Sequence, residues 1–192
     1  MLFKFTVKVD KGATVKQVEA LNAKLADKVK LNKFVGMGFA RTLQRHFNGL
    51  DSRPNKRGWR PLGFWRKISA ATSFVSADSN KAVVGVSGVQ GKMLAAKIFG
   101  TRITPKSGKK FLAIPAIESR YGISPSALDE ELQFRKTRKG GLLGTIRSDG
   151  TFLVNYFLVR SANLPRDPQA LPKFETVEND AKKSISTYLS RK

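Results

Sequence analysis

Two features of the sequence could in principle support catalysis: a histidine and a run of acidic residues. A histidine can act as a general base near neutral pH, and converging carboxylates can bind a divalent metal. His46, the single histidine, ends a helical pattern, which favours an ordinary structural role. Asp129, Glu130 and Glu131 are consecutive, and consecutive side chains do not converge on a helix. We therefore expect no enzyme, no catalytic residue, no cofactor and no metal site.

Basic residues offer electrostatic binding instead, first in a stretch where cations alternate with aromatic rings. Cations beside ring faces are typical of polyanion binding, and of single-stranded nucleic acids in particular. We interpret Trp59 and Trp65 as anchors of this stretch, with plain core residues as the alternative. The candidate basic residues of the stretch are Arg53, Lys56, Arg57 and Arg60.

Two further basic groups surround expected turns. Residues 97–116 contain lysines around a Ser-Gly turn and no acid, and a second basic run leads into a glycine pair. Cations on turns attract phosphate without reading bases, so a DNA column and an acidic protein surface both fit, as does a merely solvated surface. The candidate residues are Lys106, Lys109, Lys110, Arg135, Lys136, Arg138 and Lys139.

The periodicity of apolar residues predicts the elements that position these groups. Period-two alternation indicates strands, and spacing of three to four indicates helices. Strands are expected at 2–9, 73–77, 81–86, 102–104, 111–114, 134–137, 144–147 and 151–160. Helices are expected at 14–29 with Thr14 as the N-cap, at 32–47, 64–71 and 93–99, and from about 172 to the end. Residues 164–168 are expected to be irregular.

These elements predict an α+β fold, a mostly antiparallel sheet with N-terminal helices and a C-terminal helix packed on it. The length of 192 residues favours a single domain over 1–192. Gly, Pro and basic residues at about 48–63 predict a loop that is mobile or ordered by a partner. The C-terminal helix carries one apolar stripe: Phe174, Val177, Ala181, Ile185, Tyr188 and Leu189. We expect Phe174, Val177, Ile185 and Leu189 to be buried, against the sheet or against a neighbouring subunit.

The composition points to an anionic partner. Lys and Arg number 36 against 14 Asp and Glu, a net charge of +22, and residues 1–117 hold 23 of these cations with only 5 acids. A field of that sign attracts polyanions. The absence of cysteine excludes disulfides and fits folding inside the cell. The alternating first ten residues predict no signal peptide, and no run is long enough to span a bilayer.

Four pieces of the chain, in this order, resemble a known family. They are the tryptophan loop 59–62, the stretch AAKIFG…ITPK…KFLAIP within 95–115, the strand YFLVRS at 156–161, and Leu164-Pro165-Arg166 before a terminal helix. Together they resemble the virion morphogenesis proteins of tailed phages, the tail-completion or neck proteins. Minor tail protein Z of lambda-like phages and protein G of Mu-like phages belong to this group. Thr101 replaces the second glycine of the family's FGG, and Arg166-Asp167-Pro168 replaces its Arg-Pro-Phe.

The resemblance implies a non-enzymatic structural protein of the virion, at the head–tail interface and made in the host cytoplasm. It implies a homo-oligomer, a hexameric ring around the DNA channel, that joins the tail to the head. The implied neighbours are tail terminator, head-completion or tube proteins, with genomic DNA in the channel and no membrane. Two alternatives stay open from the residues alone: a stand-alone basic nucleic-acid-binding protein and, more distantly, a metal-dependent nuclease.

Overall fold

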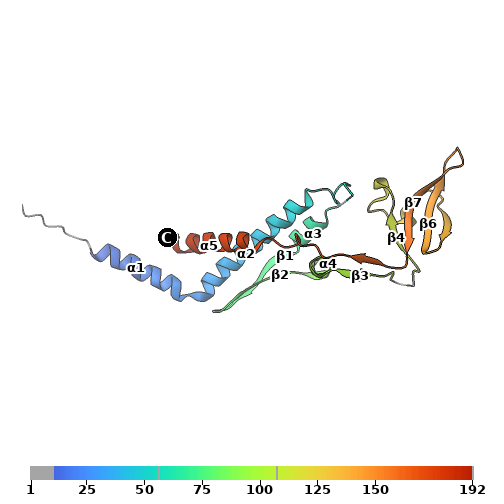
Figure 1. Cartoon of the computed structure of the whole chain (residues 1–192). Helices are drawn as coiled ribbons and strands as arrows, with labels where there is room; N and C mark the ends of the chain where they lie inside the picture. The colour runs from blue at the N-terminus through green and yellow to red at the C-terminus, as the bar shows by residue number, and fades with distance from the viewer. Residues whose placement is uncertain (1–10, 56, 107, 192) are drawn as a thin grey trace, which may run out of the picture. The chain divides into compact units, whose positions relative to one another are not determined.

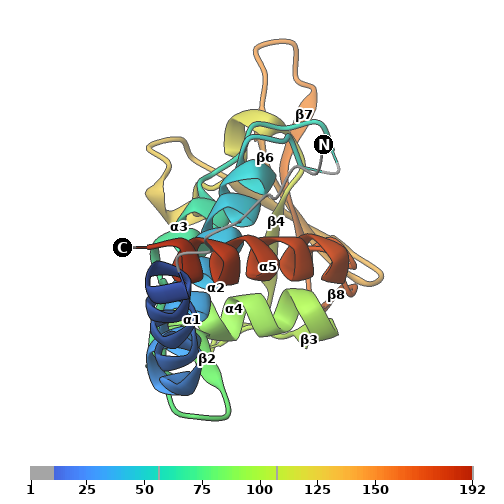
Figure 2. The ribbon, with the colours of Figure 1, turned by 90° about the vertical axis from the view of Figure 1, so that its left-hand side faces the viewer.

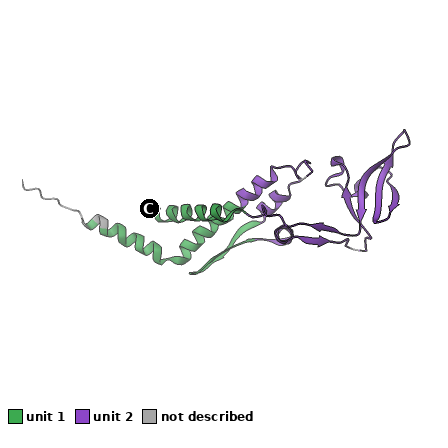
Figure 3. Cartoon of the chain, viewed as in Figure 1, with its two compact units in different colours: residues 1–43, 72–85, 172–192 green, residues 44–71, 86–171 purple. Residues whose placement is uncertain are grey.

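The computed structural model describes residues 11–55, 57–106 and 108–191 and divides the chain into two compact units (Figure 3). Unit 1 contains residues 1–43, 72–85 and 172–192, and unit 2 contains residues 44–71 and 86–171. Each unit is assembled from segments far apart in the chain, so no composition boundary in the sequence marks them. The single domain over 1–192 stays a prediction. The strand expected at 2–9 lies outside the described residues.

Unit 1 is built on two successive helices, α1 (Lys11–Ala26) and α2 (Lys28–Asp51), with α2 continuing into unit 2 from Gln44 (Figure 1). Asp27 separates them, and its Oδ1 accepts a hydrogen bond from the amide of Lys30 at 3.0 Å, as an N-cap residue does. The prediction of one helix over 14–29 is therefore wrong at both ends. The sequence already contained the signal, because aspartate is a preferred N-cap.

The middle of α2 packs on two other elements of unit 1. The hairpin β1 (Thr72–Ala77) and β2 (Ala82–Val86) lies so close that a Cβ on Gly36 would meet the Cβ of Ala82 at 2.8 Å. On α5 (Phe174–Ser190), the carboxylate of Asp180 accepts a hydrogen bond from the Thr42 hydroxyl at 2.7 Å. Asp78 closes the short turn after β1, because its side chain accepts hydrogen bonds from the backbone amides of Asn80 and Lys81.

The C-terminal helix α5 lies against α2 and touches α1 (Figure 2). Its expected stripe is only partly covered: Tyr188 packs on Phe34 with ring centroids 5.7 Å apart, but Phe174 is 78% exposed. No residue of α5 is buried within the chain, so the expected burial against the sheet is wrong, and burial against a neighbouring subunit stays a prediction. The three-to-four spacing of apolar residues predicted the helix and its apolar stripe, but not how much of that stripe is covered.

Unit 2 contains a four-stranded antiparallel sheet in the order β4-β7-β6-β5. A separate antiparallel pair joins β3 to β8, and two short helices, α3 and α4, precede the sheet in the chain. The bounds are α3 Phe64–Ala70, α4 Gly88–Phe99, β3 Thr101–Ile103, β4 Leu112–Pro115, β5 Gln133–Thr137, β6 Gly140–Ile146, β7 Phe152–Val159 and β8 Ala162–Leu164.

Unit 2 has two small cores. In the first, Phe47 and Ile68 are fully buried, and the Phe47 ring stacks on Trp65 with centroids 5.9 Å apart. In the second, Tyr156 of β7 is fully buried, and its hydroxyl donates to the carbonyl of Ile123 at 3.1 Å. The segment that carries Ile123, with 3₁₀ turns at Glu118–Arg120 and Pro125–Ala127, thereby covers one face of the sheet.

The α+β class and the mostly antiparallel pairing are confirmed. Several bounds differ: α4 begins at Gly88 rather than at residue 93, and β6 extends back to Gly140. Strand β8 includes the start of a segment expected to be irregular, because pairing with β3 supplies hydrogen bonds that its own sequence does not signal.

Candidate polyanion-binding site

The register of the four-stranded sheet brings the two predicted basic turns to one end. Thr137 pairs with Gly140, Gly140 with Val159, and Val159 with Leu112, so these four residues form one row across the sheet. Immediately beyond this row lie the β5–β6 turn with Arg138 and Lys139, Arg160 after β7, and Lys109 and Lys110 before β4. All five of these cationic residues are exposed.

Two further cations adjoin this end. The backbone of Lys109 donates to the carbonyl of Lys106 at 3.3 Å, which closes the turn of the first lysine group. On β3, the Arg102 guanidinium donates to the Ser161 hydroxyl at 3.0 Å, which holds it beside the exit of β7. We call the whole set the basic end: Arg102, Lys106, Lys109, Lys110, Arg138, Lys139 and Arg160. Arg102 and Arg160 were not among the predicted residues, because only strand pairing places them there.

The segments that form the basic end contain no acid. Residues 101–117, 132–148 and 150–166 hold neither Asp nor Glu, so the field of the seven cations is not cancelled locally. Exposed charges of one sign attract a polyanion within roughly one Debye length, about 10 Å at 0.1 M salt. The arrangement can therefore bind phosphates without base-specific contacts.

Arg135 and Lys136 lie on the body of β5 rather than at its turn. Arg135 pairs with Leu142 across the sheet, and its guanidinium carbon stands 4.0 Å from the centroid of the Phe152 ring. Lys136 pairs with Gly141 and points to the opposite face. Both side chains are exposed, but Arg135 is already engaged in a cation–π contact.

The tryptophan loop is not joined to the basic end. It begins after α2 ends at Asp51, rather than at residue 48, and it is anchored by contacts within unit 2. The Asn55 side chain accepts from the amides of Arg57 and Trp59, at 2.8 and 3.1 Å. The Arg57 guanidinium donates to the carbonyl of Pro115 at 2.8 Å and stacks on Trp59 at 4.9 Å.

Pro115 is the last residue of β4 and lies at the end of the sheet opposite the row that contains Thr137. The tryptophan loop therefore docks toward that opposite end. There the amide of Arg60 donates to a carboxylate oxygen of Glu118 at 2.8 Å, and Trp59 packs on Tyr121 with centroids 5.4 Å apart. The structure thus separates the loop from the two basic turns. The side chains of Arg53 and Arg60 are exposed, and Lys56 lies outside the described residues.

The second predicted anchor, Trp65, sits at the start of α3. Its amide donates to Asp51 Oδ1 at 3.0 Å, and its ring lies between Phe47 and Phe64, with centroids 5.9 and 5.0 Å away. Trp65 is therefore a packing residue that fixes the end of α2 against α3. The hydrogen bond to Asp51 holds the C-terminal end of the tryptophan loop, where α3 begins, close to the end of α2.

The candidate groups for catalysis do not assemble into a site among the described residues. His46 Nε2 is 2.9 Å from the carbonyl of Gln169, and its ring meets Phe47 edge-on. In the acidic run, Glu130 forms an ion pair with Arg120, which raises the pKa of that guanidinium. Across residues 11–55, 57–106 and 108–191, no group of three or more His, Cys, Asp or Glu could hold a metal ion.

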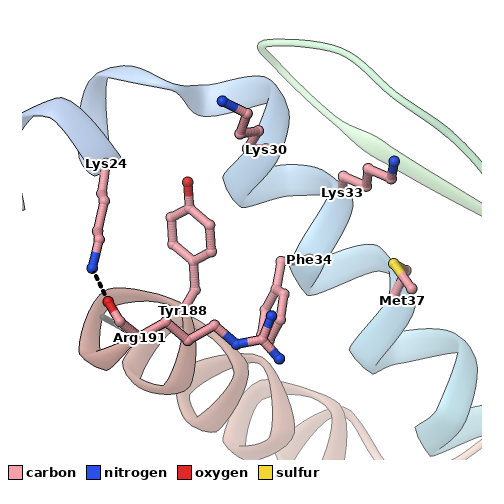
Figure 4. A pocket seen from close by; sticks show the side chains of 7 residues that line it. All are labelled: Lys24, Lys30, Lys33, Phe34, Met37, Tyr188 and Arg191. Carbon is pink, nitrogen blue, oxygen red and sulfur yellow. Dashed lines mark hydrogen bonds between the residues drawn. The ribbon is translucent and has the colours of Figure 1, made fainter.

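Unit 1 carries a separate basic pocket of about 270 Å³ (Figure 4). Three of its cations are already engaged: Lys24 donates to the carbonyls of Leu189 and Arg191, Lys30 pairs with Asp27, and the Arg191 guanidinium covers the Phe34 ring. The pocket was not predicted, because its lining comes from α1, α2 and the C-terminal helix α5 with Arg191 just after it, and α5 is far from the other two in sequence. Its lining residues are Lys24, Lys30, Lys33, Phe34, Met37, Tyr188 and Arg191.

Comparison of the chain with models of protein families, with curated proteins and with solved structures found no match. Within the part of the chain that the structure describes, no helix is both long and apolar enough to cross a membrane.

Proposed function

We propose that this chain is a structural virion protein of the phage head–tail joint, a tail-completion or neck protein that acts in a ring around the DNA channel. It carries no catalytic site in this reading. The observation that carries the proposal is the way in which the segments of the phage resemblance come together in unit 2.

The resemblance segments are neighbours in space although they are spread over a hundred residues. Strand β3 pairs with β8, and β4 pairs with β7, which joins the second segment to the third and the fourth. The amide of Asp167 donates to the carbonyl of Lys97 at 2.8 Å, and Arg57 beside the tryptophan loop donates to Pro115. Residues that form one contiguous framework are the ones that a shared fold would preserve.

Gly100 illustrates this framework. Its φ of 73° lies in the left-handed region that favours glycine. A Cβ at this position would also stand 3.1 Å from both the amide nitrogen of Arg166 and the carbonyl oxygen of Leu164. Glycine at this position therefore allows the Leu-Pro-Arg segment to approach the end of α4 closely. The replacement of the family's next glycine by Thr101 falls on strand β3, where a side chain is tolerated.

The basic end supports a place beside DNA. Seven exposed cations on a sheet end without local acids provide sequence-independent attraction for a phosphate backbone, which suits a channel through which any genome sequence passes. Exposed apolar residues at helical spacing on α1 support assembly with other subunits, because a contiguous apolar group marks an interface. They are Val15, Val18, Leu21 and Leu25, each at least 40% exposed. Tail terminator, head-completion and tube proteins are the proposed neighbours in the virion.

The test is genetic and structural, in a phage or prophage that encodes the chain. Deleting the gene should leave DNA-filled heads and separate tails that fail to join, as seen by negative-stain electron microscopy of the lysate. Antibody or mass-spectrometric detection should find the protein in intact particles. Normal infectious particles without the protein would rule the proposal out.

The alternative, a stand-alone basic nucleic-acid-binding protein, is favoured by the same basic end. It predicts the protein on intracellular nucleic acid rather than in purified particles. The localisation experiment therefore separates the two candidates directly.

A further inference from the structure

The basic pocket of unit 1 brings aromatic rings and cations together in one small space. Its lining comes from the end of α1, the first half of α2 and the end of α5 (Figure 4). Phe34 and Tyr188 supply the aromatic part, with ring centroids 5.7 Å apart, and Met37 extends this apolar surface. At about 270 Å³ the pocket suits one small group rather than a large cofactor. The charged part of the lining consists of four cations: Lys24, Lys30, Lys33 and Arg191.

Two of these cations are held in place without being neutralised. Lys24 Nζ donates to the carbonyl of Leu189 at 3.0 Å and to that of Arg191. The guanidinium carbon of Arg191 lies 4.5 Å from the centroid of the Phe34 ring. Carbonyl oxygens and aromatic rings carry no net charge, so both cations keep their full positive charge. Because their positions are already fixed, an anion that binds here orders fewer side chains.

The acids near the pocket do not cancel its charge. Residues 20–40 and 181–191, which supply the lining, contain one acid, Asp27, and it pairs with Lys30 at 2.8 Å. Two other acids contact α2, and both have partners elsewhere. Asp78 accepts hydrogen bonds from two amides of its own turn, and Asp180 accepts one from the Thr42 hydroxyl. The pocket therefore keeps an excess of positive charge beside its rings.

We propose that this pocket binds one unpaired nucleotide of a single-stranded nucleic acid. The base lies on the aromatic surface of Phe34 and Tyr188, and the adjoining phosphates lie against the surrounding cations. Every base has a π-face, so this mode of binding accepts any sequence. A base within a duplex is already paired and stacked on its neighbours, so duplex DNA does not enter the pocket. The pocket thus differs in its ligand from the basic end, which attracts the phosphates of a duplex.

The rings favour a nucleotide over an acidic peptide. Glutamate and aspartate side chains offer negative charge but no planar surface, whereas a nucleotide offers both together. Lysine and arginine side chains alone would serve an acidic peptide equally well. The inference is independent of the place of the chain in a virion, because it follows from this pocket alone.

The first experiment measures binding of labelled five-nucleotide probes by fluorescence anisotropy, with full-length protein freed of cellular nucleic acid at high salt. Tyr188→Leu removes a ring and should weaken binding of oligothymidine about tenfold, whereas Tyr188→Phe keeps the ring and should bind as the wild type does. Lys33→Gln should also weaken binding, and Lys183→Gln is its control, with the same loss of charge at an exposed residue of α5 outside the pocket. All proteins compared carry five changes to Gln that remove binding at the basic end: Lys109, Lys110, Arg138, Lys139 and Arg160.

Circular dichroism and thermal melting check that each variant folds, and the exposed Lys33 keeps the test decisive if Tyr188→Leu does not. Equal affinities of Tyr188→Leu and Tyr188→Phe overturn the proposal, as does equal weakening by Lys33→Gln and Lys183→Gln. A duplex probe that loses as much affinity as the single strand in Tyr188→Leu overturns it too. So does a pentaglutamate peptide that competes as well as unlabelled oligothymidine. Oligouridine of the same length tells DNA from RNA, and loss of either single-stranded probe in Tyr188→Leu supports the proposal.

The second experiment locates the base in the wild-type chain. A single-stranded probe with one 5-iodouracil is irradiated with the protein, and the cross-linked tryptic peptides are identified by mass spectrometry. Peptides 34–41 and 184–191 contain Phe34 and Tyr188, and we expect cross-links in one or both of them. Cross-links confined to other peptides would overturn the proposal.

Discussion

The strongest consequence of the basic end concerns the salt dependence of DNA binding. Consider the change of Lys109, Lys110, Arg138, Lys139 and Arg160 to Gln, five exposed positions that lie just beyond one row of the sheet. None of these side chains has a described packing role, so the fold should survive. The net charge falls by five from +22.

The expected magnitude follows from counterion release. If each of the seven cations neutralises one phosphate, log K falls with log salt concentration with a slope of about −6, and the variant should retain a slope of about −2. The measurement is fluorescence anisotropy of a labelled duplex over a salt series. Because cations on turns do not read bases, duplexes of different sequence should give the same slope.

A control variant distinguishes the effect of the basic end on DNA binding from the effect of the net charge. Five exposed lysines of unit 1 are changed to Gln, with the same loss of five charges: Lys16, Lys28, Lys33, Lys81 and Lys183. This variant should bind somewhat more weakly but keep a slope near that of the wild type. An unchanged slope in the basic-end variant, or equal flattening in both variants, would refute the assignment of these residues as the DNA-binding surface.

Three further outcomes test the fold. Gly36→Ala should destabilise unit 1 by about 1–3 kcal/mol, because the added methyl group would overpack against the hairpin. Gly49→Ala, in the same helix but with open space around it, should stabilise the protein by up to about 1 kcal/mol. Urea titration measures both free energies of unfolding, and equal effects would contradict the packing. Asn155→Leu should leave the free energy of unfolding unchanged or raise it by up to about 2 kcal/mol, because neither polar atom of this fully buried side chain forms a hydrogen bond with a described protein group. A large loss of stability in the same titration would show that the side-chain amide has hydrogen-bond partners. Hydrogen bonds from Lys30 lower the pKa of Asp27. The Asp27 carboxylate should therefore stabilise helix α2 at neutral pH and lose this effect as the pH falls through the lowered pKa. Far-UV circular dichroism should show this acid transition in the wild type but not in Asp27→Asn.

The secondary structure was largely predictable where a local rule decides it. Alternation over 151–160 and the Asp149-Gly150 turn predicted strand β7, which spans Phe152–Val159, because period-two patterns depend only on neighbouring residues. The start of α4 was missed because Gly88 and Gly91 lower local helix propensity. Strand β8 was missed because its pairing with β3, sixty residues away, stabilises it.

The candidate site was only half predictable. The sequence located both basic turns, since lysine and arginine around glycine are visible locally. It also suggested the tryptophan loop as an equal partner, which the structure places toward the other end of the sheet. The cations Arg102 and Arg160 carried no signal of their own, because their positions depend on which residues lie opposite them.

The sequence by itself determined the charge of this protein, its α+β class and the positions of its exposed basic turns, because these follow from composition and from interactions between near neighbours. Only the tertiary structure decided that Thr137, Gly140, Val159 and Leu112 share one row, and therefore that three separate basic segments meet at one end. It also decided that the segment of Ile123 lies on the face of the sheet that contains Tyr156. The physical reason is strand register: a shift by one residue reverses every side chain, and pairing between distant segments sets it.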